Sequence, residues 1–317
     1  MTRRSHRSSL RQAYGQALAE LGERNPRVAV LDADLSTATG TAAFARQFPE
    51  RAVNVGVADA TMMTIAAGLA LDGRPTFVGT NAVFAVGEAY NFVRQSICFQ
   101  DAPVKIVGCP SGLSAGADGG TVQSLEDLGL ARGLPGMTVL APADAPSARA
   151  ATFALAERPG PAYLRLTDEQ LPDVSDGTVV VGRAPERHAG SDLTIVAIGA
   201  LVHRAVEVAE ELADVGVSVR VLDLVSVKPC DASALLRAAR ETGAILVVED
   251  HSVETGVGAL VAATTAEAYP VPVRRLGIPD LFGESGGSEE LLDRYGLSRT
   301  RIRAEAWDLL QLRGKVT

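Results

Sequence analysis

Residues 104–123 read Val-Lys-Ile-Val-Gly-Cys-Pro-Ser-Gly-Leu-Ser-Ala-Gly-Ala-Asp-Gly-Gly-Thr-Val-Gln, and this stretch decides the expected fold. Its first residues are almost uniformly apolar, which is typical of a strand covered on both faces of a parallel sheet. The glycine-rich remainder is costly to order, and a long flexible loop inside a compact domain is usually functional. Because ligands gather at the carboxyl ends of strands in open α/β sheets, we expect a site at this loop.

Similar short apolar runs recur on both sides of this stretch, and helical patterns separate several of them. The expected strands are 28–31, 76–79, 104–108, 138–141, 193–198, 217–222, 245–248 and 271–276. The clearest expected helices are 62–71, 146–156, 202–214 and 232–241. Strands and helices that alternate at this spacing need crossover connections, so the sequence predicts an α/β fold with mostly parallel sheets flanked by helices.

The segment 167–191 interrupts this pattern with prolines, glycines and charged residues. We interpret it as a connector with a short hairpin at Val179-Val180-Val181, and the length of 317 residues suggests one domain on each side of it. The predicted organisation is a first domain over 1–170, a linker over 171–190 and a second domain over 191–317.

The composition argues against several classes of partner. A net charge of −8 argues against a nucleic acid or an anionic membrane, and no apolar run approaches the length of a membrane span. The three cysteines, Cys98, Cys109 and Cys230, are too widely spaced to indicate a zinc site or a disulfide framework. Reduced thiols without an apolar leader predict a cytoplasmic protein.

Polar residues also occur at other predicted strand ends. Asp59 and Thr61 precede an apolar helix, and helix capping is the simplest explanation of both. Asp118 is the only carboxylate of the glycine-rich loop. His251 follows the strand 245–248, and two interpretations of it have equal weight: an acid–base or ligand-contacting group, or a surface histidine flanked by acidic residues.

An ordered series of strings along the chain indicates a family. The strings are Arg11–Leu18, Leu31–Ser36, Ala66–Ala70, Pro103–Gly108, Leu125–Leu128, Pro135–Val139, Pro161–Leu166, Val221–Pro229, Val248–Ser252 and Phe282–Gly286. Together they resemble the C-terminal section of transketolase and its relatives, including deoxyxylulose-phosphate synthase and the β subunits of 2-oxoacid dehydrogenases. The resemblance extends from about Ser9 to Leu310, nearly the whole chain.

The resemblance implies a pyrimidine-binding domain followed by the family's C-terminal domain, with thiamine diphosphate bound between two subunits or domains. In this family a Gly-Asp-Gly motif with a downstream asparagine, on a separate domain, holds the diphosphate and its Mg²⁺. This sequence lacks that motif, so we assign no metal ligand to it. A transketolase N-terminal-section subunit is expected to hold both groups, in an α2β2 heterotetramer, because family members pair their pyrimidine-binding domains.

The resemblance also implies which residues touch the cofactor. The family's catalytic glutamate, which bonds the pyrimidine ring, corresponds to Asp59, and the same string ends at Met62. Of the two aromatic residues that stack on the ring, the first corresponds to Asn81 and the second is kept as Phe84. We therefore expect these four residues to bind the cofactor, with Asp59 as the catalytic residue.

Departures from the family at the substrate site indicate a non-standard substrate. The two family histidines that handle the sugar correspond to Pro110 and Val122, whose side chains exchange no protons. Asp118, which contacts a substrate hydroxyl in the family, is kept, as is Arg165. The expected substrate-binding residues are Asp118, Arg165, Ser114, Gln123 and His251.

The leading hypothesis is the C-terminal subunit of a two-component enzyme that transfers a ketol or acyl unit from a small ketose or 2-oxo acid by means of thiamine diphosphate. Its substrate would be less polar than a sugar phosphate, or unphosphorylated. An alternative is a catalytically degenerate or regulatory subunit that keeps only the assembly interface, which the altered site residues would explain. A third hypothesis places a different cofactor or a nucleotide in the altered pocket.

Overall fold

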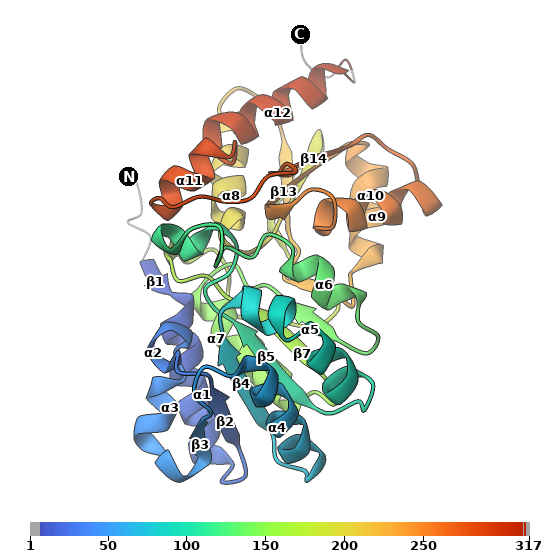
Figure 1. The fold of residues 1–317 in the computed structure, drawn as a ribbon. Coiled ribbons are helices and arrows are strands. Elements are labelled where there is room, and N and C mark those ends of the chain that lie inside the picture. The colour runs from blue at the N-terminus through green and yellow to red at the C-terminus, as the bar shows by residue number, and fades with distance from the viewer. Residues whose placement is uncertain (1–6, 313, 315–317) are drawn as a thin grey trace.

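A computed structural model describes residues 7–312 and 314, and Figure 1 shows two α/β halves stacked one above the other. The larger sheet has seven strands in the order β12-β6-β7-β5-β4-β2-β3. Every neighbouring pair in this sheet is parallel except β12 and β6. The strands are β2 (Ala29–Asp32), β3 (Ala52–Asn54), β4 (Thr76–Thr80), β5 (Val104–Gly108), β6 (Thr138–Leu140), β7 (Ala162–Arg165) and β12 (Ser226–Lys228).

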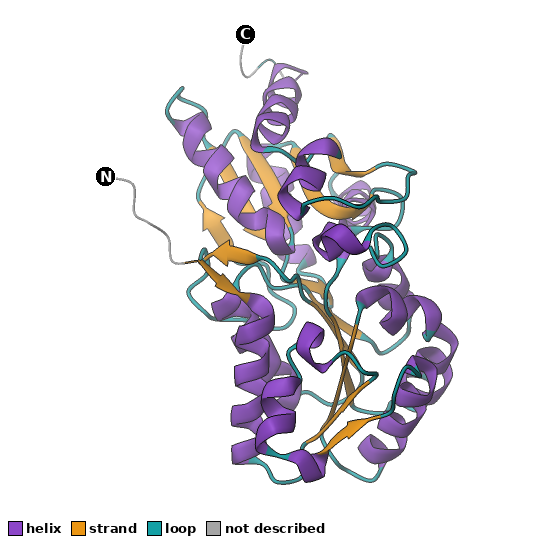
Figure 2. Ribbon diagram, turned by 60° about the vertical axis from the view of Figure 1, so that its left-hand side comes forward, coloured by secondary structure: helices purple, strands orange, loops and turns teal. Residues whose placement is uncertain are grey.

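Helices cover both faces of this sheet, as the strands' uniformly apolar character requires (Figure 2). Successive strand residues alternate between the two covered faces: Phe77 packs with α1 and α7 on one, and Val78 packs with α4 on the other. The helical segments of this half are α1 (Leu10–Arg24), α2 (Ser36–Thr39), α3 (Ala42–Gln47), η1 (Pro49–Arg51), α4 (Asp59–Leu71), η2 (Phe84–Glu88), α5 (Tyr90–Phe92), η3 (Val93–Cys98), η4 (Gly112–Asp118), α6 (Asp127–Gly133) and α7 (Ala145–Glu157).

The second sheet has five strands in the order β14-β13-β10-β11-β9, parallel except for the β11–β9 pair. Its strands are β9 (Glu186–His188), β10 (Leu193–Ala197), β11 (Val219–Asp223), β13 (Ile245–Ser252) and β14 (Val273–Ile278). The cores place α8 and α12 on one face and α9 and α10 on the other (Figure 1). The helical segments are η5 (Gly199–Leu201), α8 (Val202–Ala213), α9 (Ala232–Thr242), α10 (Val257–Ala268), α11 (Ser288–Arg294) and α12 (Arg299–Leu312).

The two halves are not independent. Strand β12, from the later part of the chain, completes the larger sheet by pairing antiparallel with β6. One apolar cluster also joins both halves, because Val196 of β10 and Leu235 of α9 belong to the same buried cluster as Met62 of α4. These contacts fix the position of one sheet relative to the other. The candidate site lies at the carboxyl ends of strands from both sheets.

The connector differs from its prediction. The predicted hairpin at Val179-Val180-Val181 is wrong, since these residues form no strand. The ordered pieces lie on either side: β8 (Gln170–Pro172) pairs antiparallel with β1 (Arg7–Ser9), and β9 pairs antiparallel with β11. Both short strands lie within or across the predicted linker, and each pairs with a strand of one half. The predicted domain boundaries at 170 and 191 therefore stay predictions.

The predicted fold class is confirmed, with two mostly parallel sheets, each flanked by helices. All eight predicted strands are present, with small shifts at their ends. Over the described residues, none of the helices combines the length and the apolar character that a membrane crossing requires.

Candidate active site

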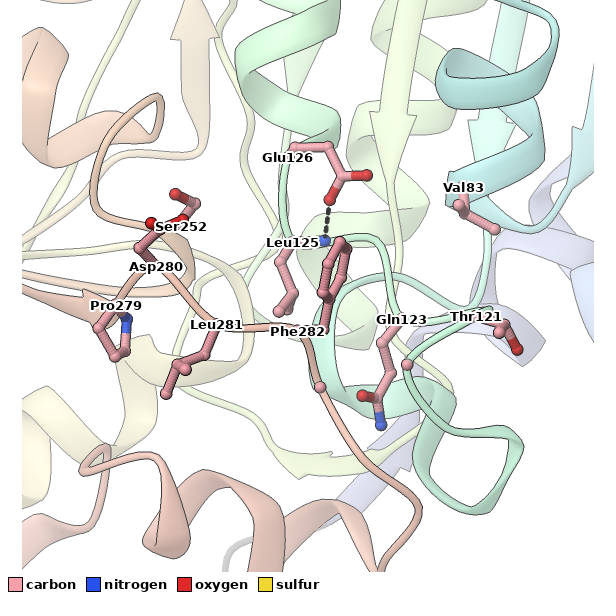
Figure 3. Close-up of a pocket in the computed structure, with 12 residues that line it drawn as sticks. Val83, Thr121, Gln123, Leu125, Glu126, Ser252, Pro279, Asp280, Leu281 and Phe282 are labelled. Atoms are coloured by element: carbon pink, nitrogen blue, oxygen red, sulfur yellow. Dashed lines mark hydrogen bonds between the residues drawn. The ribbon is translucent and has the colours of Figure 1, made fainter.

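A cavity of about 890 Å³ lies at the carboxyl ends of strands from both sheets (Figure 3). Four loops enclose it: Val83 follows β4, residues 120–126 follow β5, Ser252 ends β13, and residues 279–283 follow β14. This is the position at which parallel α/β sheets bind ligands, and the glycine-rich loop quoted above forms one wall. The sequence therefore predicted one wall of the cavity, but not the loop 279–283 that faces it.

The walls of the cavity are apolar and acidic. Leu281 and Phe282 are exposed by 63% and 88%, and Leu125 lies on the same lining. Glu126 accepts the backbone N–H of Leu125 at 2.8 Å (Figure 3), and burial raises the pKa of its carboxyl group. Asp280 is the second carboxylate, and the described lining contains no lysine or arginine. The part of the cavity built by this chain thus provides no cation for an anionic ligand.

Asp59 opens α4, but it does not cap the helix. The N-cap residue is Ala58, and no side-chain hydrogen bond caps the helix, so the capping explanation is wrong. Asp59 is 4% exposed, and its Oδ1 accepts a hydrogen bond from the Thr80 hydroxyl at 2.5 Å. Thr80 ends β4 and is fully buried. The pair places a buried carboxylate at the carboxyl edge of the larger sheet, and no motif in the sequence distinguishes Thr80.

The other three expected cofactor residues lie in different environments. Asn81 follows Thr80, is 7% exposed, and its Oδ1 has no hydrogen-bond partner among the described residues. Phe84 begins the π-helical segment η2 and is half-buried. Met62 is fully buried in the core under α4, behind the surface that a ligand would touch. Of the residues around this turn only Val83 lines the cavity described above, so the assignment of Asn81, Phe84 and Met62 to a cofactor stays a prediction.

The glycine-rich loop is ordered by its own hydrogen bonds. Ser114 Oγ donates to the Ser111 carbonyl at 2.6 Å. Gln123 is 3% exposed, and its Nε2 donates to the carbonyls of Gly116 and Glu284 at 3.2 and 2.9 Å, which ties this loop to the one after β14. Asp118 is exposed at the end of η4. The loop therefore presents Asp118 to solvent and uses Gln123 to hold the two walls together.

Arg165 lies in a buried ion-pair network between the halves. Its Nε lies 2.9 Å from Asp127 Oδ2 and its Nη1 lies 2.7 Å from Asp250 Oδ1, and the three side chains are at most 3% exposed. Tyr163 donates its hydroxyl to Asp127 Oδ2 at 2.7 Å. Asp127 begins α6 and Asp250 lies on β13, so the network clamps the two sheets behind the cavity. The guanidinium group of Arg165 is therefore bonded to these carboxylates, and it is not exposed to the cavity.

His251 is also internal. Its side chain is 0% exposed, so the hypothesis of a surface histidine is wrong. Its Nδ1 lies 3.0 Å from the Ser252 carbonyl, and its Nε2 accepts the backbone N–H groups of Leu128 and Gly129 at 3.2 and 3.4 Å. Burial lowers the pKa of His251 to about 4, so the ring is neutral at pH 7 and occupied on both nitrogens. It anchors the start of α6 and is not placed for proton transfer.

The buried polar groups of this site fit part of a thiamine-type cofactor. An aminopyrimidine ring presents a ring nitrogen, and the buried Asp59 carboxyl group is a hydrogen-bonding partner of the right kind for it. A diphosphate and its Mg²⁺ need oxygen ligands and fixed donors. Within the described residues no group of three or more His, Cys, Asp or Glu is arranged to hold a metal.

Comparisons with known families match both halves of the chain. Residues 7–173 match the family model described as the transketolase pyrimidine binding domain, and residues 182–302 match the transketolase C-terminal domain. The two matches together span most of the described residues, in the order that the sequence resemblance implies.

Individual relatives show the same correspondence over most of their length. The 6-deoxy-6-sulfo-D-fructose transketolase subunit SqwH of a Clostridium species is 38% identical over 304 residues, covering 95% of this chain and 94% of that one. An apulose-4-phosphate transketolase subunit of Phocaeicola vulgatus is 36% identical over 304 residues, covering 95% and 97%. A solved split gene transketolase, an inactive β4 tetramer, is 41% identical with a TM-score of 0.87, covering 96% of this chain and 98% of that one.

Proposed function

Since this chain belongs to the transketolase family, we propose that it is the C-terminal subunit of a two-component thiamine diphosphate enzyme that transfers a ketol or acyl unit. Relatives of nearly equal length are named as subunits of transketolases, which supports a separate N-terminal-section partner. Thiamine diphosphate, when bound, supplies the electron sink that allows a bond beside a carbonyl to break. The protein's task is to bind, orient and shield the reacting groups.

The observation that carries this proposal is the buried Asp59 carboxylate. An unpaired buried carboxylate is costly, yet Asp59 is kept at 4% exposure, and among the described residues only the Thr80 hydroxyl bonds its side chain, at Oδ1. Its second oxygen remains available for the cofactor's pyrimidine ring, the role that the family gives to a glutamate. In this role Asp59 holds a proton at the ring nitrogen, and Phe84 provides a face for the ring.

The cavity favours a substrate without a phosphate at the end that this chain contacts. Its described lining carries two carboxylates and an apolar wall, and Pro110 and Val122 stand where the family has histidines. A phosphate bound there would meet no lysine or arginine of the described lining. We assign the exposed Asp118 to a substrate hydroxyl, because a carboxylate in water binds such a group at little cost. Ser114 and Gln123 shape the loop that carries it.

Arg165 and His251 act through position in this proposal. Asp127, Asp250 and backbone groups bond the polar atoms of these two side chains. We therefore propose that both residues hold the two sheets together and do not contact the substrate. The cavity's shape then depends on the ion-pair network, because its walls come from both halves.

An apolar surface supports assembly with other subunits. Along α4, α5 and the segments beside α4 and η3 the exposed apolar residues are Val57, Ile65, Leu71, Phe92 and Phe99, and α4 packs against α5 and η3. A surface of this kind on a soluble protein usually marks an interface. We propose that it packs in an α2β2 heterotetramer whose partner subunit holds the diphosphate and Mg²⁺. The related split gene transketolase is described as an inactive β4 tetramer, so we expect this chain alone to self-associate without activity.

Calorimetry with thiamine diphosphate and Mg²⁺ tests the proposal, first on this chain alone and then on its complex with the N-terminal-section subunit. We expect binding to the complex only. An Asp59→Asn variant should assemble normally but weaken binding, since the amide changes the proton that the side chain can hold. A folded, assembled complex that binds no thiamine diphosphate would overturn the proposal.

The alternative of a degenerate or regulatory subunit has its own supporting observation, since Asn81, Pro110 and Val122 all replace residues that the family uses. An Asp59→Glu variant separates the two candidates. A weakened enzyme should gain activity with its partner, by up to about a hundredfold if the missing methylene displaces the carboxylate by about 1 Å. A degenerate subunit should be inactive with either residue. Its location in the cytoplasm stays a prediction from the sequence.

A further inference from the structure

A second, smaller cavity lies at the edge of the larger sheet opposite the candidate active site. It has a volume of about 130 Å³ and is lined by the ends of α4 and α7 and by the segments that enter β4 and β5. Among its described lining residues, Arg74, Lys105 and Arg158 are cationic, and the others are alanine, glycine and proline. The lining therefore gathers positive charge in a chain whose net charge is −8.

Lys105 lies on β5 and is 2% exposed. Its Nζ donates to the carbonyls of Arg158 and Gly160 at 2.7 and 2.6 Å, and no described residue accepts its third N–H. Burial, followed by the neighbouring Arg158, lowers the pKa of Lys105 to about 8, and Asp101 opposes this shift. The ammonium group is thus still charged at pH 7, and a bound anion would offset both causes of the shift.

The two arginines of the cavity also keep donors for a ligand. Nε of Arg158 donates to the Thr138 hydroxyl at 2.9 Å, whereas its two terminal nitrogens bond no described residue. Nε of Arg74 lies 3.8 Å from Asp72 Oδ2, but the two side chains are 48% and 77% exposed, so this pair is weak. Guanidinium groups present their N–H donors in a plane that matches the oxygens of a phosphate or a sulfate.

Two other cavities contain arginine, and each includes an arginine with a close carboxylate. In the one lined by β14 and α12, Arg274 pairs with Glu305 at 2.7 Å. In the one lined by α1 and α3, Arg11 pairs with Asp168 at 2.7 Å. The small cavity differs from both, because no described carboxylate forms an ion pair with its Lys105 or Arg158.

We infer that this cavity binds a small tetrahedral oxyanion, either a free phosphate or sulfate ion or the terminal group of a phosphate ester. One water molecule takes up about 30 Å³ of the liquid, so the cavity has room for an ion of five heavy atoms. The inference does not depend on thiamine diphosphate. Because the cavity lies at the amino ends of the strands, the anion would stabilise the chain and take no part in the reaction.

Isothermal calorimetry of the isolated chain at pH 7 and constant ionic strength tests the site, with inorganic phosphate as the probe. We expect saturable binding of one ion per chain. Arg158→Gln should weaken binding about tenfold, since hydrogen bonds between charged groups are the strong ones. Arg237→Gln is the matched control, because it removes the same charge from an exposed position on α9, outside the described lining. It should leave the affinity unchanged.

Two further ligands refine the assignment. Glycerol 3-phosphate distinguishes the sources of the anion: the ester should bind more weakly than phosphate at a site for the free ion, and more tightly at a site for an organic phosphate. Sulfate stays doubly charged as the pH rises, so its affinity reports the charge of the protein. Because Lys105 loses its proton near pH 8, the sulfate affinity should fall by up to about tenfold between about pH 7 and about pH 9.

Three results would overturn the inference: no saturable binding of phosphate to the wild-type chain, an unchanged affinity in Arg158→Gln, or an equal loss in Arg237→Gln. The last result would mean that the ion responds only to the net charge. Arg74→Gln, at an exposed position, is the second variant if Arg158→Gln misfolds, and it should also weaken binding. All of these results are independent of the calorimetry with thiamine diphosphate, so failure here leaves the proposed function standing.

Discussion

Replacing Arg165 by methionine tests the role of the buried ion-pair network. Arg165 is 2% exposed, and its partners Asp127 and Asp250 are 0% and 3% exposed, so neither carboxylate has solvent to replace the arginine. Removing one partner of a buried pair costs about 3–5 kcal/mol. Asp127 keeps the Tyr163 hydroxyl at 2.7 Å, whereas Asp250 loses its arginine contact. We therefore expect Arg165→Met to lower the free energy of unfolding by about 4 kcal/mol.

Urea unfolding of the isolated chain at pH 7 measures this loss. Arg149→Met is the matched control, because Arg149 pairs with Glu20 through two bonds of 2.6 and 2.7 Å but both side chains are over a third exposed. The control should lose less than about 1 kcal/mol, as exposed pairs do. If Arg165→Met costs no more than Arg149→Met, the clamp between the two sheets does not exist as described.

The loss should also depend on pH in a defined direction. Burial raises the pKa of Asp250 in the folded protein, and Arg165 opposes that rise. In Arg165→Met, Asp250 should keep its proton in the folded state at pH values where the unfolded state has already released it. The stability of this variant should therefore fall as the pH rises above 3.8, the ordinary pKa of an aspartate carboxyl group. The deficit of Arg165→Met should therefore shrink between pH 7 and about pH 5. Adding Asp250→Asn should recover part of the loss at pH 7.

Three further changes test other parts of the argument. Thr80→Val removes the hydroxyl that donates to Asp59 and should lower turnover of the complex about tenfold, while Thr80→Ser keeps the hydroxyl and should retain the rate. If the valine and serine variants turn over at the same rate, the hydroxyl does not position the carboxylate. Burial, followed by neighbouring carboxylates, raises the pKa of Glu169 to about 7 from 4.5, so its contribution to stability is lost as the pH rises between those values, and Glu169→Gln should flatten that slope in unfolding titrations. Gly112 has φ of +56°, and a Cβ there would lie 2.2 Å from Asp250 Oδ2, so Gly112→Ala should destabilise the chain by more than about 1 kcal/mol in the same assay.

The sequence predicted the fold because its signal is strong where strands are buried on both faces. Phe77 and Val78 point to opposite covered faces, so the strand must be apolar at both positions, and a continuous apolar run is visible without a structure. The strands that were not predicted, β1, β3, β8, β9 and β12, have three residues each, too few to show a pattern. Val179-Val180-Val181 shows the converse, because β-branched residues favour a strand only where a partner strand is available.

The candidate site was only partly predictable, because a motif fixes which residue stands at a position but not which neighbours satisfy it. Asp59, Arg165 and His251 are all polar residues near strand ends, and all are buried. Their hydrogen-bond partners differ. The polar atoms of Arg165 and His251 are bonded by groups from both halves of the chain, whereas only one oxygen of Asp59 is bonded by a described residue. The bonds between the halves, Arg165 to Asp250 and Leu128 to His251, join residues 85 and 123 positions apart, and only the packing of the two sheets brings them together.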